Sequence, residues 1–165
     1  MKDLRISVID RCNFRCPYCM PKQTYGESYR FLGSDKYLNF DEIDRLVRIF
    51  VDEGVRKIRL TGGEPLLRPN LFHSISKLSK IPQIEDLALT TNGYLLLEQA
   101  ESLRRSGLQR VTVSLDSSDP QVFKQMNGLG LSLDKVLNGI DHAFQLGFNP
   151  IKLNAVVQKG INDHT

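Results

Sequence analysis

The chain has 165 residues, of which 41% are hydrophobic and 25% are charged, and its formal net charge is +3 at pH 7. The length fits one domain, and the composition is typical of a soluble globular protein. It has no run of about 20 apolar residues that could cross a bilayer, and Lys2, Asp3 and Arg5 interrupt any apolar secretory signal. We therefore expect a protein that does not enter a membrane and is either cytoplasmic or follows a transit sequence that is not present here. So small a charge does not predict nucleic-acid binding.

The first predicted strand, Leu4–Ile9, is followed closely by all three cysteines of the chain, Cys12, Cys16 and Cys19. An odd, tightly clustered set is a poor disulfide framework, and a reducing compartment favours metal binding or catalysis. Structural zinc takes four protein ligands, whereas closely spaced thiolates hold iron–sulfur clusters. Three thiolates on a four-iron cluster would leave one iron open. The alternative, three buried structural cysteines, is opposed by their spacing and by the turn residues around them.

Strand and helix patterns alternate through the rest of the chain. The further expected strands are Lys57–Thr61, Asp86–Thr91, Val111–Asp116 and Ile151–Val157, and the expected helices are Phe40–Glu53, Leu71–Leu78, Leu95–Ser106 and Leu133–Leu146. Asn39 and Glu42 form a capping-box-like pair at the start of the first helix. Residues 22–36 lack periodicity and are expected to form a loop. This alternation predicts an α/β fold with a parallel sheet.

Every predicted strand carries one polar face, as where Ile58 and Leu60 alternate with Arg59 and Thr61. Parallel sheets covered on both faces normally have continuous apolar strands. Burying so many unpartnered polar groups would be costly. We therefore predict a partial (βα) barrel, with parallel strands inside, helices outside and a wet cavity along the polar face. The alternative is an open sheet with one face in solvent.

Arg5, Arg59 and Lys152 fall on the polar phase of three different strands. Each cation taken alone is typical of a solvated surface. Their shared phase predicts instead that they converge on an anion, and Arg and Lys are the usual partners of phosphate. We therefore expect the cavity to take a phosphorylated substrate.

Two motifs together resemble the radical S-adenosylmethionine (SAM) enzymes: Cys12-x3-Cys16-x2-Cys19, and the segment TGGEP (61–65) after the second strand. Three longer stretches of sequence indicate one family within this group of enzymes. RCNFRCPYCMP (11–21), LTTNG (89–93) and VSLDS (113–117) are similar to the GTP 3′,8-cyclase family of molybdenum cofactor biosynthesis.

The resemblance implies that a [4Fe–4S] cluster is held by the three cysteines and that its unique iron binds SAM. Cleavage of SAM would then yield a 5′-deoxyadenosyl radical that attacks GTP. The cofactor contacts implied are Tyr18, Gly63 and Ser114, and the GTP contacts implied are Arg5, Arg59, Thr90 and Lys152. An electron donor such as flavodoxin or ferredoxin is implied as a partner, without nucleic acid or membrane. Dimers occur among relatives, which makes a homodimer possible.

Members of the cyclase family are about twice as long and carry a second three-cysteine cluster in their C-terminal part. We therefore interpret residues 1–165 as an incomplete radical SAM core domain that lacks the second-cluster region. Two alternatives stay open. One is another radical SAM enzyme, such as a peptide-modifying maturase, and the other is an inactive, truncated cluster-binding module.

Overall fold

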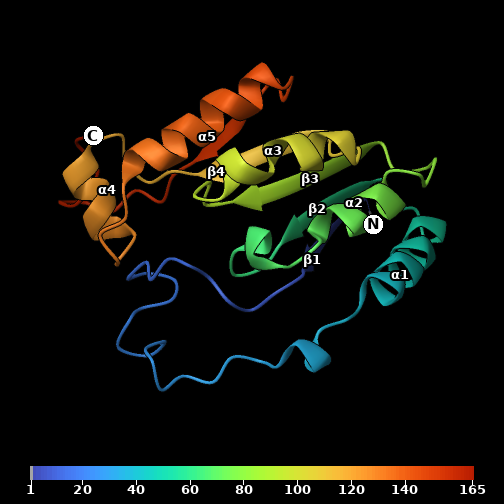
Figure 1. Cartoon of the computed structure of the whole chain (residues 1–165), viewed down its shortest axis with the longest axis horizontal. Coiled ribbons are helices and arrows are strands. Elements are labelled where there is room, and N and C mark those ends of the chain that lie inside the picture. The colour runs from blue at the N-terminus through green and yellow to red at the C-terminus, as the bar shows by residue number, and fades with distance from the viewer. Residues whose placement is uncertain (1) are drawn as a thin grey trace.

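The computed structural model describes residues 2–165 and forms one sheet of five strands with helices beside it (Figure 1). The strands are β1 (Asp3–Ser7), β2 (Lys57–Thr61), β3 (Asp86–Thr91), β4 (Arg110–Ser114) and β5 (Lys152–Asn154). They lie in chain order and each pairs in parallel with the next. The predicted α/β class with a parallel sheet is confirmed.

The helices are α1 (Phe40–Asp52), α2 (Leu71–Leu78), α3 (Leu96–Arg105), α4 (Pro120–Met126) and α5 (Leu133–Gln145), and short 3₁₀ turns occur at Ser34–Lys36 and Pro65–Leu67. Helix α4 was not expected from the sequence. Its start nevertheless carries a recognisable signal, since the Asp119 side chain accepts hydrogen bonds from the backbone of Gln121 and Val122, and Pro120 occupies the first turn.

The expected capping box at the start of α1 is present. The Asn39 side chain accepts hydrogen bonds from the backbone N–H groups of Asp41 and Glu42, and the Glu42 carboxylate accepts one from the Asn39 N–H. These bonds satisfy donors that the first helical turn cannot pair internally. The helix therefore begins where the sequence predicts.

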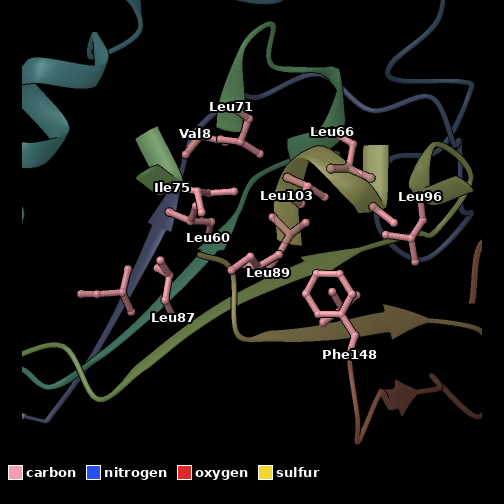
Figure 2. Packing of buried hydrophobic residues seen from close by; sticks show 14 of the residues in the cluster. Val8, Leu60, Leu66, Leu71, Ile75, Leu87, Leu89, Leu96, Leu103 and Phe148 are labelled. Carbon is pink, nitrogen blue, oxygen red and sulfur yellow. The ribbon is translucent and has the colours of Figure 1, made fainter. Parts of the chain in front are cut away.

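The hydrophobic core lies between the helices and one face of the sheet. Figure 2 shows Leu60 and Leu89 of the strands facing Leu71 and Ile75 of α2 and Leu103 of α3. All five side chains are buried. Burying each contributes roughly 1.5–3 kcal/mol relative to exposure, so the apolar phase of the strands is what attaches the helices.

The opposite face of the sheet is polar over much of its area, as predicted, and Arg5 of β1 pairs in register with Arg59 of β2. The predicted arrangement, with helices covering the apolar face of the strands, does not hold at Leu153 of β5, which is 53% exposed. The reason is that β5 is a three-residue strand at the edge of the sheet, while α5 packs mainly on α3. Among the described residues, no helix is long and apolar enough to cross a membrane.

Candidate active site

A cavity of about 620 Å³ opens at the carboxyl ends of the strands and is lined by all three cysteines. The segment after β1 carries them; Figure 1 shows it in blue, running towards α4. Residues from the ends of β2, β3 and β4 line the same cavity. Ligands of open parallel α/β sheets bind at this end of the strands.

The three thiols are free, and their donor set fits a multi-iron cluster. Burial raises the pKa of Cys12, and burial together with the nearby Asp116 carboxylate raises that of Cys16 to about 12. These two thiols must therefore release protons when they ligate metal. Within residues 2–165, no three His, Cys, Asp or Glu side chains are close enough to hold a single ion. A cluster takes its thiolates on separate irons, so wider spacing suits it.

Gly63 packs against the cysteine-bearing segment. Its N–H donates to the carbonyl of Ile9 at 2.7 Å, and the N–H of Glu64 donates to the carbonyl of Arg11 at 2.7 Å. A Cβ at position 63 would lie 2.9 Å from the carbonyl oxygen of Asp10, closer than real side chains come. Glycine is therefore required here because the backbone of this turn approaches the cysteine-bearing segment.

The Glu64 side chain is 1% exposed and ties the turn after β2 to the end of β3. Its carboxylate accepts hydrogen bonds from the Thr91 hydroxyl (2.7 Å), the Asn92 N–H (2.8 Å) and the Leu66 N–H (3.0 Å). Burial raises its pKa to about 6, while these bonds oppose the rise. The buried carboxylate therefore links the turn after β2 to the end of β3 through hydrogen bonds.

Asn92 connects this hydrogen-bonded group to the cysteine-bearing segment. Its side-chain amide donates to the Asn13 carbonyl oxygen at 2.7 Å and lies 3.8 Å from the Cys12 sulfur. The N–H of Phe14 lies 3.3 Å from the same sulfur. Hydrogen bonds to thiolates are one way a protein tunes an iron–sulfur site.

Tyr18 bridges the mouth of the cavity. Its hydroxyl donates to the Asp116 carboxylate at 2.5 Å, and the other Asp116 oxygen accepts from the Val156 N–H at 3.0 Å. Burial and the bond to Asp116 raise the pKa of Tyr18. The aromatic ring is thus fixed between the cysteine-bearing segment and the chain that follows β5.

The structure brings together some, but not all, of the residues expected to bind GTP. Arg5 and Thr90 line the large cavity. Arg59 lines an adjoining pocket of about 220 Å³ that Arg5 also lines. Lys152 pairs in register with Thr112 on β4 but is exposed and lines neither pocket.

The side chain of Thr90 also lines the large cavity. Its hydroxyl oxygen is buried and has no hydrogen-bond partner among residues 2–165. A buried hydroxyl without a partner is costly, which points to a ligand oxygen or nitrogen in the adjacent cavity. Ser114 lines the same cavity from the end of β4.

Sequence reasoning missed Arg110, which joins Arg5 and Arg59 in the smaller pocket. The expected strand began at Val111, one residue too late to include it. Arg110 also differs electrostatically, because its guanidinium forms an ion pair with Asp86. Its charge is therefore partly neutralised, whereas Arg5 and Arg59 form no ion pair among the described residues.

These features define a parallel α/β protein with three free cysteines lining a cavity at the carboxyl ends of its strands. Comparison with known proteins identifies its family. A family model described as the Radical SAM superfamily matches residues 6–165. The chain belongs to that superfamily.

The predicted partial barrel is also confirmed by solved structures. The chain aligns with Streptococcus suis SuiB bound to S-adenosylmethionine at a TM-score of 0.75 and 20% identity, covering 95% of this chain and 34% of that one. Methylornithine synthase (PylB) aligns at 0.73 and 17%, covering 98% and 45%.

The names of similar curated proteins indicate one group of enzymes within this superfamily. The chain is 53% identical to the GTP 3′,8-cyclase of Acidothermus cellulolyticus, covering 99% of this chain and 45% of the relative. It is 49% identical to that of Staphylococcus haemolyticus, covering 99% and 48%. The chain spans about half the length of the curated relatives it matches.

Proposed function

We propose that residues 1–165 form the radical SAM core domain of a cytoplasmic GTP 3′,8-cyclase, the enzyme that begins molybdenum cofactor biosynthesis. One observation carries the proposal: a single cavity gathers Cys12, Cys16 and Cys19 with Gly63, Ser114, Thr90 and Arg5. Relatives at about 50% identity across this chain bear that enzyme's name. The alternative of a peptide-modifying maturase has no comparable support, since the aligned solved structures are at most 20% identical to this chain and show only the fold.

Cys12, Cys16 and Cys19 would hold the [4Fe–4S] cluster. The chemistry that this cluster supplies when bound is one electron for the cleavage of SAM. The chain's own contribution is positional: Gly63 allows the turn after β2 to close against the cysteine-bearing segment, and Asn92 donates towards the Cys12 sulfur. Tyr18, which donates a hydrogen bond to Asp116, and Ser114 are proposed to contact SAM, and both line the cavity that the cysteines line.

Arg5 and Arg59 are proposed to bind the triphosphate of GTP. They pair in register on neighbouring strands and line the same pocket. Guanidinium groups bind phosphate oxygens through their planar fork. Thr90 supplies an unpartnered hydroxyl in the larger cavity, which Arg5 also lines, and Lys152 contributes a longer-range positive charge from β5. The chain holds three cysteines, so the second three-cysteine cluster of the cyclase family is not formed by these residues.

The test is formation of 5′-deoxyadenosine by anaerobically reconstituted protein supplied with SAM and a strong reductant, with and without GTP. Wild-type chain should form it, and GTP should stimulate its formation. Cys16→Ala should abolish it, and Arg30→Gln, on an exposed loop, is the control that should not. A loaded cluster that never cleaves SAM would favour the inactive-module alternative. Cleavage that GTP neither stimulates nor inhibits would favour another radical SAM activity.

A further inference from the structure

Arg15, between two of the cysteines, joins three segments of the chain. Its backbone N–H donates to the carbonyl of Asn127, just after α4, at 2.8 Å. Its Nε donates to the carbonyl of Tyr25 at 2.8 Å, and its Nη1 donates to the carbonyls of Cys12 (2.7 Å) and Phe14 (2.8 Å). One side chain thus fixes the backbone on the N-terminal side of Cys16 and ties it to the following loop.

Aromatic rings accompany this guanidinium. Tyr25 and Tyr29 lie with ring centroids 4.6 Å apart, and Tyr29 and Phe31 with centroids 4.7 Å apart. The Arg15 guanidinium carbon lies 5.7 Å from the Phe31 ring centroid. The side chain is half-buried. The cation therefore has less contact with water than a typical surface arginine, and its field is screened less.

The charge of Arg15 is not neutralised by a carboxylate. Among residues 2–165 it forms no ion pair, and its side-chain bonds go to carbonyl oxygens and to the Met20 sulfur, 3.8 Å from Nη1. Arg48 and Arg110, by contrast, pair with Asp44 and Asp86. A full positive charge is therefore fixed within the segment that carries the ligands.

We propose that Arg15 is a positioning residue that holds the ligating segment in shape and, as a fixed cation, raises the reduction potential of the cluster bound there. The inference rests on the proposed binding of a cluster by the three cysteines. Reduction adds negative charge to a cluster, so a nearby cation stabilises the reduced form. Local charge is among the features through which a protein sets the potential of such a site.

The experiment compares the midpoint potentials of reconstituted wild type, Arg15→Gln, Arg15→Lys and Arg30→Gln by redox titration followed by electron paramagnetic resonance. In Arg15→Gln the ratio of reduced to oxidised cluster at a given potential should fall about tenfold, which is 59 mV more negative for a one-electron couple. Arg15→Lys should keep the wild-type midpoint because it keeps the charge. It should bind less iron, because an ammonium cannot reproduce the forked contacts. Arg30→Gln, which lies exposed on the loop that follows the cysteines, should match wild type.

A wild-type midpoint in Arg15→Gln would overturn the inference, as would equal shifts in all three variants. If Arg15→Gln holds no cluster, the midpoint of Arg15→Lys is the remaining check: a shift of the tenfold size, although the charge is kept, refutes the role of the charge. Failure of the wild-type chain to bind a cluster is a separate result. It would contradict the proposed function itself, before any variant is measured, and this inference with it.

Discussion

Two glycines after α4 offer a matched test of how the cysteine-bearing segment is held in place. Gly128 and Gly130 have similar positive φ values of 71° and 68°. A Cβ on Gly128 would lie 2.7 Å from the carbonyl carbon of Arg15 and closer still to its oxygen, whereas one on Gly130 would meet nothing within 4 Å. Alanine therefore brings the same backbone strain at both positions but a collision at only one.

The magnitudes follow from this difference. Left-handed backbone costs a non-glycine residue about 1–2 kcal/mol, which applies to both variants. The Cβ at position 128 would lie about 0.7 Å nearer to the Arg15 carbonyl carbon than the 3.4 Å at which ordinary contact begins, and nearer still to the carbonyl oxygen. Overpacking of this kind adds roughly 1–3 kcal/mol. We expect Gly130→Ala to lower the free energy of unfolding by about 1–2 kcal/mol and Gly128→Ala by about 2–5 kcal/mol.

Urea denaturation of the iron-free protein measures both values, with equal denaturant slopes required for the comparison. Iron content after reconstitution provides a second measurement. Gly128→Ala should bind less iron, because the displaced carbonyl belongs to the residue before Cys16, and Gly130→Ala should bind the wild-type amount. Equal losses of stability and equal iron contents in the two variants would show that contact with the segment after α4 does not position the ligands.

Three further predictions concern the cap of α1, the buried carboxylate and the phosphate pocket. Asn39→Ala removes both hydrogen bonds that its side chain accepts in the capping box and should lower the free energy of unfolding by about 1 kcal/mol in urea denaturation; no loss would mean that the box is not formed in solution. Burial raises the pKa of Glu64 to about 6, above the ordinary 4.5. The folded chain therefore binds this proton more tightly than the unfolded chain, and lowering the pH from 7 to 5 should stabilise wild type by about 1 kcal/mol relative to Glu64→Gln; parallel pH profiles of the two proteins in urea denaturation would refute this. Arg59→Gln should weaken GTP binding in equilibrium dialysis about tenfold or more, because a charged hydrogen bond contributes roughly 1.5–3 kcal/mol, while the exposed Arg105→Gln should not; equal affinities in the two variants would remove Arg59 from the substrate site.

Secondary structure was predictable where a strand or helix ends in a turn. The ranges of β2, β3 and α2 agree with expectation to the residue. The first strand was expected to run to Ile9, because Val8 and Ile9 continue its apolar pattern. Both are indeed buried, but beyond the paired strand. Val156 and Val157 were assigned to the last strand, yet they are exposed, and the Val156 N–H donates to Asp116 instead of to a sheet neighbour.

The candidate site likewise has residues that the sequence could predict and contacts that it could not. Local spacing suffices to single out the three cysteines, and a shared strand phase suffices to single out Arg5 and Arg59. The partners of Tyr18 and Asn92 could not be predicted, because Tyr18 bonds to a residue 98 positions away and Asn92 to one 79 positions away. Such contacts depend on how strand ends converge, which periodicity does not encode.

The strand order has a consequence for how the protein is made. Each strand pairs with the one synthesised just before it, so the sheet can extend at one edge in the order in which the strands are made. The cysteine-bearing segment emerges early, but its last restraints, the Asn127 carbonyl and the Tyr18–Asp116 bond, come from residues made much later. The cysteine-bearing segment therefore lacks these two restraints until three further strands, β2, β3 and β4, have been made.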